Sequence, residues 1–260
     1  MNVNQAKYYK RPFSEGVEAL LVNNHKLSFP FHFHPTFNIS LVYDGTFNTQ
    51  LTDKLLYAPS GTILITNPHE IHANPSDKIS TVSFFTFYIS PGFMQFCNNN
   101  KPVVFEQKVI DDTVLFTALH RLSTKINQAD PSFEKELKNA LFLLAAAYGS
   151  EQEIKEDHQL VSLFEDFLTE DDASKFSLED AANRFGIDKF KFIRLFKFQT
   201  GLTPNNYFIM KRIEKSKTLL AEGRDVFGIA IDLGFYDAAH YCNHFKKFTG
   251  ISPAAYSAGV

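Results

Sequence analysis

The sequence predicts an α+β protein with a β-rich N-terminal domain and an all-α C-terminal domain. The segment Thr200 to Tyr207 (TGLTPNNY) recurs 49 residues later at Thr249 to Tyr256 (TGISPAAY), and a repeat at this period is typical of a duplicated supersecondary unit. Short apolar runs broken by turn residues fill positions 17–93, a pattern typical of strands. A polar, charged stretch at 149–157 separates the two regions.

Length and composition fit two domains that each bury a core. We expect domains at 1–150 and 158–260, with a linker at 151–157. The net charge of −3 excludes a generally basic nucleic-acid binder. Cys97 and Cys242 are isolated, which favours a reducing compartment. Because no signal peptide or apolar run of membrane length is evident, we expect a cytoplasmic protein without a membrane partner.

Each copy of the repeat is typical of a helix-turn-helix. In the first copy, Ser177 and Asp188 can cap two helices, and Gly186 can form the turn between them. The second helix is expected over 189–199, with Phe192, Leu195 and Phe196 on its buried face. Gly201 should end that helix. The second copy repeats this order with Gly234, Gly250 and the Ser252-Pro253 helix start.

Basic residues gather on and after the second helix of the first copy. Between 187 and 217 there are eight basic residues (189, 191, 194, 197, 211, 212, 215 and 217) and two acidic ones (188 and 214). Such a patch can contact phosphates, and exposed residues early in the helix can reach base edges. A solvated helix face is the alternative. The DNA contacts predicted here are Lys189, Phe190, Lys191, Ile193, Arg194, Lys197 and Arg212.

Residues 158–260 resemble the DNA-binding domain of the AraC/XylS family of transcriptional regulators, on the evidence of the duplicated motif. The resemblance implies seven helices, including a linker helix from Pro204 to about Glu222 that joins two helix-turn-helix units. A rigid linker can hold two recognition helices about 34 Å apart, so that one protomer reads two successive major grooves.

The second unit departs from the family pattern, in which polar and Arg side chains are common along the recognition helix. Alanine can touch a thymine methyl group but cannot hydrogen-bond a base. Our hypothesis is that the first unit supplies most of the specificity, while the second clamps the DNA backbone. The contacts predicted in the second unit are Ala238, Ala239, His240, Asn243, Lys246 and Lys247.

The N-terminal region reads as a small β-barrel or sandwich. Strands are expected at 39–43, 47–51, 62–65 and 81–89, and Asp44-Gly45 indicates a hairpin between the first two. The order of motifs resembles the cupin-like sensor domain of many AraC-family regulators. The motifs are His32-x-His34, Gly45, Pro59-Ser60-Gly61 and Pro68-His69-Glu70-Ile71-His72.

This resemblance raises the question of a metal. Enzymatic cupins bind a metal through an HxH pair, a Glu and a later His, a ligand set suited to Fe, Mn or Zn. His32, His34 and His72 match the histidines, but Asn38 occupies the position of the Glu. His69 and Glu70 could complete a site only with a different spacing. We therefore predict no metal, no other cofactor and no catalytic residue, and a metal-dependent cupin enzyme fused to a DNA-binding domain stays the alternative.

If the barrel senses a small molecule, inward-facing strand residues should line the pocket. A packed barrel core would use the same aromatic residues, and a one-residue slip would reverse the choice of face. Leu41 and Thr86 belong to the same candidate face. The predicted effector-binding residues are Phe31, His32, Phe33, His34, Phe37, Ile39, His72, Phe84 and Tyr88.

Two helices are expected between the domains, at about 113–127 after Asp111 or Asp112 and from Pro131 through Tyr148. The family resemblance implies that they form a hairpin against the barrel and a dimer interface, and simple packing onto the barrel is the alternative. We expect a sequence-specific DNA-binding transcriptional regulator, and the family habit implies a ligand-responsive activator. Its expected partners are double-stranded DNA, an unknown small-molecule effector, a second copy of the chain and RNA polymerase. A ligand-free regulator is the remaining alternative.

Overall fold

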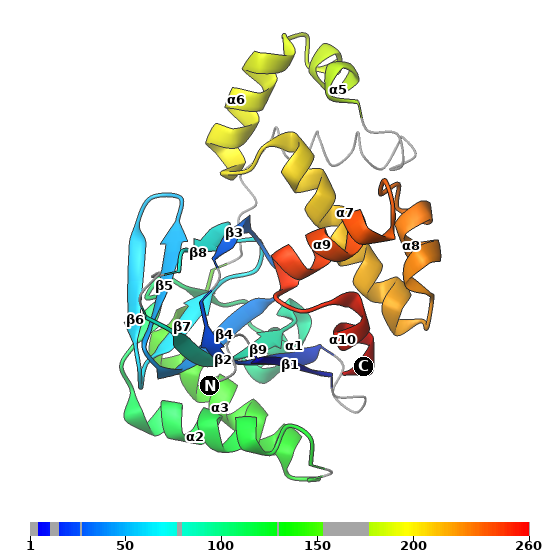
Figure 1. Ribbon diagram of the computed structural model, residues 1–260. Coiled ribbons are helices and arrows are strands. Elements are labelled where there is room, and N and C mark those ends of the chain that lie inside the picture. The colour runs from blue at the N-terminus through cyan, green and yellow to red at the C-terminus, as the bar shows by residue number, and fades with distance from the viewer. Residues whose placement is uncertain are drawn as a thin grey trace. The chain divides into compact units, whose positions relative to one another are not determined.

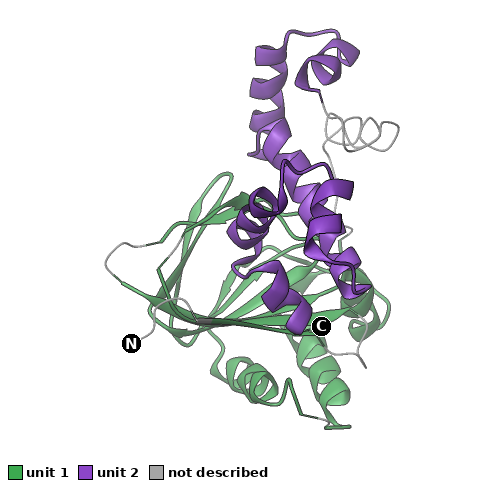
Figure 2. Cartoon of the chain, turned by 45° about the vertical axis from the view of Figure 1, so that its right-hand side comes forward, with its two compact units in different colours: residues 1–155, 259–260 green, residues 156–258 purple. Residues whose placement is uncertain are grey.

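The computed structural model describes residues 5–10, 16–26, 28–76, 80–128, 130–152 and 177–259. The chain divides into two compact units, residues 1–155 with 259–260, and residues 156–258 (Figure 2). Of the predicted linker, residues 153–157 lie outside the described residues, as does the helix implied between 158 and 176. The α+β fold class is confirmed, because strands dominate the first unit and helices form the second.

The first unit contains two antiparallel sheets that face each other (Figure 1). One sheet has six strands in the order β1-β2-β9-β4-β7-β11, and the other has four in the order β3-β8-β5-β6. A short pair, β10–β12, stands apart from both. The strands are β1 Gln5–Lys10, β2 Val17–His25, β3 Phe29–His32, β4 Phe37–Asp44, β5 Thr46–Leu51, β6 Leu55–Pro59, β7 Ile63–Thr66, β8 His72–Asn74, β9 Val82–Ile89, β10 Val104–Phe105, β11 Val109–Ile110 and β12 Gly149–Ser150.

The hairpin predicted at Asp44-Gly45 is wrong, although the strands on both sides of it exist. β4 pairs with β7 and β9, whereas β5 pairs with β6 and β8. The chain therefore passes from one sheet to the other at Gly45. This turn requires glycine, since its φ is +75° and a Cβ would lie 2.2 Å from the carbonyl oxygen of Thr81.

Side chains on β4 and β9 alternate between two environments. On one face, Ile39 and Phe87 are fully buried and belong to the apolar core formed with the helices of the first unit. Leu119 and Leu137 belong to the same core from the helical side. The helices are α1 Pro91–Cys97, α2 Thr113–Thr124 and α3 Phe133–Tyr148. The two predicted helical stretches are thus confirmed, and Asp112 is the residue that caps α2.

The opposite face of the large sheet, here called the inner face, is directed at the four-stranded sheet. The hydroxyl oxygens of Ser40 on β4 and Thr86 on β9 lie 2.7 Å apart. Phe84 on β9 stacks on Phe47 of β5, with ring centroids 4.3 Å apart. One strand pair therefore supplies both the core beneath the helices and the interior of the barrel.

Residues 177–258 of the second unit form six helices, and the predicted capping residues Ser177 and Asp188 are confirmed. Side chains of Ser177, Asp188 and Thr203 accept hydrogen bonds from backbone N–H groups at the starts of α5, α6 and α7. Leu195 was expected on the buried face of α6 but is 39% exposed, and the buried face is occupied by Phe192 and Phe196. The helices are α5 Leu178–Arg184, α6 Lys189–Thr200, α7 Pro204–Ala221, α8 Val226–Asp232, α9 Ala238–Thr249 and α10 Pro253–Ala258.

The repeated Thr-Gly pair has the same structure in both copies. Gly201 and Gly250 end α6 and α9 in the left-handed conformation, with φ of +68° and +81°. The Thr200 hydroxyl donates to the carbonyl of Phe196 at 2.7 Å and accepts from the backbone N–H of Leu202 at 3.1 Å. The repeat in the sequence therefore encodes a hydrogen-bonded stop after each recognition helix.

We expect Thr200→Val to lower the free energy of unfolding by about 1–3 kcal/mol, because valine keeps the shape but leaves buried backbone groups without this partner. Thr249→Val is the matched control. Thr249 is less buried, and its bond from Ile251 N is longer at 3.4 Å, so its loss should be smaller. Urea unfolding followed by circular dichroism measures both. Equal stability of Thr200→Val and the parent would contradict the assignment.

Candidate DNA-binding surface and barrel interior

Three basic residues of α6, here called the basic ridge, lie on its exposed side. Lys191, Arg194 and Lys197 follow one another at intervals of three and are all exposed. Residues at this spacing share one helix face. Phe192 and Phe196 are fully buried on the other side of the helix. The helix is thus anchored by aromatic side chains and presents its positive charges to solvent.

The start of α6 is fixed by polar contacts. One carboxylate oxygen of Asp188 accepts from the N–H groups of Phe190 and Lys191, each at 3.0 Å. These bonds, first of all the one from Lys191, lower the pKa of Asp188. Lys189 forms a 2.7 Å ion pair with Glu179 of α5, so its charge is partly compensated there. Phe190 is 62% exposed and Ile193 is half-buried, so the structure brings Phe190 to the ridge side.

The second recognition helix, α9, is presented in the same way. Tyr241 and Phe245 are fully buried. The Nε2 atoms of His240 and His244 lie 3.0 Å apart, one helical turn from each other. Ala238 and His244 are half-buried. The predicted contact residues that are exposed on α9 are Ala239, His240, Asn243, Lys246 and Lys247.

Arg212 on α7 does not join the basic ridge. Its Nη1 donates to the carbonyl oxygen of Gly234 at 2.8 Å, and its guanidinium lies 4.1 Å from the ring centre of Phe208 and 5.6 Å from that of Phe235. Burial lowers the pKa of Arg212 to about 10. The structure thus places Arg212 between the long helix and the turn of the second helix-turn-helix, where tertiary packing overrides the charge pattern that predicted a DNA contact.

The interior of the first unit brings three predicted residues together, and we call them the histidine cluster. His32 ends β3, His72 begins β8 directly opposite it, and His34 follows two residues after His32. Ligand atoms of the three rings lie within 4.8 Å of one another. All three side chains are buried, at 4%, 8% and 4% exposure in sequence order. Among the described residues, these three histidines form a group of side chains that could hold a metal ion.

Glu70 and His69, the other candidate metal ligands, form contacts outside the histidine cluster. A carboxylate oxygen of Glu70 lies 2.8 Å from the Nζ of Lys108 and accepts from the backbone N–H of Asn67 at 2.9 Å. His69 is exposed and lies beside Phe33, with ring centroids 5.7 Å apart. Neither residue belongs to the histidine cluster.

The predicted effector-binding residues divide between the two faces of the large sheet. Phe84 and Tyr88 lie on the inner face, and the ring centroid of Tyr88 is 5.3 Å from that of His34. The inward placement of Phe37 and Ile39 is wrong, since both belong to the core beneath the helices. The matching inner-face residues of β4 are Asn38 and Ser40, because side chains alternate along a strand. The same alternation moves Leu41 to the core and keeps Thr86 inside. Phe31 is half-buried and Phe33 is buried.

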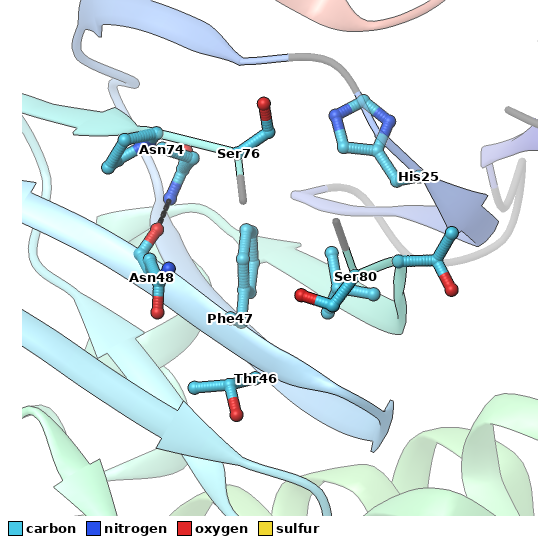
Figure 3. Close-up of a pocket in the computed structure, with 10 residues that line it drawn as sticks. His25, Thr46, Phe47, Asn48, Asn74, Ser76 and Ser80 are labelled. Atoms are coloured by element: carbon cyan, nitrogen blue, oxygen red, sulfur yellow. Dashed lines mark hydrogen bonds between the residues drawn. The ribbon is translucent and has the colours of Figure 1, made fainter. Parts of the chain in front are cut away.

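A small polar cavity lies between the sheets, and the sequence reasoning missed it. His25, Phe47, Asn48 and Asn74 contribute to its walls (Figure 3). The centre of a water molecule can occupy about 20 Å³ of it, which suits a bound water rather than a metabolite. Asn74 donates to the carbonyl of Asn48 at 3.3 Å across the cavity wall. Side chains of consecutive strand residues such as Phe47 and Asn48 point to opposite faces, so the sequence pattern of β5 does not indicate this cavity.

If Arg212 acts through packing, Arg212→Ala should destabilise the second unit by about 1–3 kcal/mol, because the Gly234 carbonyl loses a charged donor. The slope of DNA affinity against salt concentration should stay unchanged, since no phosphate contact is lost. Thermal unfolding and salt-dependent binding test the two parts. A normal melting temperature together with a reduced salt slope would contradict this role.

Comparisons with known proteins agree with both halves of this description. Residues 16–146 match the AraC-like ligand binding domain, and residues 181–259 match a helix-turn-helix domain. The uncharacterized regulator YbfI of Bacillus subtilis is 26% identical over 86% of this chain and 85% of its own. The transcriptional activator RhaS of an Enterobacter strain is 25% identical over 87% and 86%.

Solved structures show the same fold. A ToxT variant without ligand, from Vibrio cholerae, has a TM-score of 0.62 and covers 95% of this chain and 99% of its own, at 13% identity. None of the helices in the described ranges is long and apolar enough to span a membrane. Because one family model covers more than half of the chain and a second covers the repeat, this chain belongs to the AraC family of helix-turn-helix transcriptional regulators.

Proposed function

We propose that the chain regulates transcription by binding a specific DNA sequence chiefly through its first helix-turn-helix. The observation that carries this proposal is the basic ridge of α6, exposed on a helix whose other side is locked by buried aromatic side chains. A rigid helix with exposed cations on one face fits the major groove of B-DNA. The duplicated motif supports a second contact one turn of the duplex away.

The residues of the first helix-turn-helix divide into two roles. Arg194 can form a bidentate contact with guanine, the commonest base-specific contact of arginine. Lys191 and Lys197, on the same face, can bind phosphates, which fixes register without reading sequence. Phe190 and Ile193 can offer apolar contacts to thymine methyl groups. Lys189 contributes less charge than its neighbours because Glu179 pairs with it.

The second helix-turn-helix has a different balance of residues. Neither Ala239 nor Asn243 can form the bidentate contact with guanine that arginine forms. Lys246 and Lys247 lie exposed in the last turn of α9. We infer that this unit clamps the backbone and adds affinity more than specificity. Ala238 and His240 complete the surface it presents. A protomer would then read mainly one of the two successive grooves.

The first unit is proposed to bind a small-molecule effector. One ToxT structure is of a protein with bound unsaturated fatty acid, and RhaS is named as an activator, which supports effector control and activation here. The inner face combines aromatic rings of Phe84 and Tyr88 with the hydroxyls of Ser40 and Thr86. Such a surface suits a ligand with an apolar body and a few polar groups.

The remaining parts of the proposal concern organisation. We place the effector domain at 1–150 and the DNA-binding domain at 158–260, joined by 151–157. The α2–α3 helical hairpin is proposed as a homodimer interface, and RNA polymerase as a partner during activation. A cytoplasmic location follows from this role. The named relatives are transcriptional regulators, and we propose no catalytic step.

Two substitutions in one helix separate base reading from phosphate binding. Arg194→Ala should weaken binding to the specific site by about 1–3 kcal/mol and relax the preference at one base pair. Lys197→Ala should weaken binding to specific and unrelated duplexes alike and lower the salt slope by about one. Lys54→Ala, an exposed lysine between β5 and β6, is the control and should change neither.

Fluorescence titrations at several salt concentrations, with circular dichroism to check the fold, measure all three variants. If Arg194→Ala and Lys197→Ala had the same effect on every duplex, base reading by Arg194 would be excluded. If neither changed affinity, the basic ridge would not be the DNA-binding surface.

A further inference from the structure

We propose that His32, His34 and His72 form a binding site for one divalent transition-metal ion, with Zn²⁺ the leading candidate. The inference concerns the interior of the first unit and is independent of DNA binding. It departs from the expectation drawn from sequence alone, which rested on the absence of a carboxylate at Asn38. Support for a metal site comes from the arrangement of the three imidazoles, which the sequence alone does not show.

The first observation is convergence. Ring centroids are 4.3 Å apart for His32 and His72, 4.8 Å for His32 and His34, and 5.6 Å for His34 and His72. Their ligand atoms all lie within 4.8 Å of one another. Nitrogen ligands of a tetrahedral Zn²⁺ stand about 3.3 Å apart, given Zn–N bonds of about 2.0–2.1 Å. The rings therefore have to draw in by about 1.5 Å at most.

The second observation is the orientation of the rings. The Nδ1 atom of His32 lies 2.7 Å from the carbonyl oxygen of Pro30, and the Nδ1 atom of His72 lies 2.8 Å from that of Glu70. A carbonyl oxygen only accepts, so Nδ1 carries the proton in both rings and Nε2 has the lone pair of the neutral imidazole. Metal-binding histidines are oriented by the same kind of bond from the second ring nitrogen.

The ligand type narrows the ion. Imidazole nitrogen suits Zn²⁺, Cu²⁺, Ni²⁺ and Fe²⁺, whereas Mg²⁺ and Ca²⁺ prefer oxygen. Three protein ligands leave a coordination position for water or a ligand atom. Asn38 and Tyr88 are register partners on the inner face, and Tyr88 lies beside His34. A metal here would thus lie between the four-stranded sheet, which holds His32 and His72, and the inner face of the large sheet.

The test uses the full chain, with any affinity tag removed and metal stripped by a chelator. Zn²⁺ is titrated by calorimetry, and Co²⁺ is used as a probe whose visible absorption reports tetrahedral nitrogen coordination. We expect one ion per chain. His32→Gln, His34→Gln and His72→Gln should each weaken binding by at least about 100-fold, more than the 10–100-fold loss typical of removing an outer-shell partner.

The control must exclude His240 and His244 on α9, whose Nε2 atoms lie 3.0 Å apart and could chelate a metal by themselves. The double variant His240→Gln/His244→Gln should retain full binding. Binding that survived the three barrel variants and disappeared in this double variant would overturn the proposal. No binding of Zn²⁺ or Co²⁺ by the parent chain would overturn it too.

A measurement on the unmodified chain covers the case in which a barrel variant fails to fold. Long-range nitrogen–proton NMR spectra of the parent identify the protonated nitrogen of each imidazole. Zn²⁺ should shift the Nε2 resonances of His32 and His72 and one ring-nitrogen resonance of His34, and leave the Nδ1 protons of His32 and His72 in place. Shifts confined to exposed histidines would contradict the assignment.

Discussion

The alternation of side chains along β4 and β9 is the constraint on which the first unit depends. These paired strands bury Ile39 and Phe87 beneath the helices and direct Ser40 and Thr86 into the barrel. A slip of one residue would exchange the two sets and destroy both the core and the inner face. Because Gly45 then carries the chain into the opposite sheet, the barrel has two walls, and the inner-face side chains and the histidine cluster lie between them.

The second unit also separates a buried face from an exposed face, but it does so on helices. Each recognition helix buries aromatic side chains on one side and exposes polar or basic ones on the other, and a Thr-Gly stop fixes where the helix ends. The long helix α7 packs against helices of both copies, and Arg212 ties it to the turn before α9 through the Gly234 carbonyl. The basic ridge is therefore presented by a rigid support. Discrimination between base pairs requires such a support, because a loosely held arginine gains little from a bidentate contact.

Structural features that depend on neighbouring residues could be predicted from the sequence better than features that depend on long-range contacts. The repeat, the caps Ser177 and Asp188 and the left-handed glycines could be predicted, since each depends on a few neighbouring residues. The partner of β4 could not, because Asp44-Gly45 fits a hairpin as well as a crossing between sheets. The faces of β4, the exposure of Leu195 and the position of Arg212 depend on tertiary packing. The histidines were identified from their spacing, but the orientation of their rings follows from backbone carbonyls that only the fold brings near.

Recognition of a specific DNA sequence by this chain can be measured in a salt-dependent binding titration. Fragments from beside the chain's own gene are compared with a scrambled duplex of the same length by fluorescence. We expect tight binding to one fragment, a clear preference over the scrambled duplex and a steep fall in affinity as salt rises. Equal, weak binding to both duplexes at every salt concentration, with and without added Zn²⁺, would contradict it.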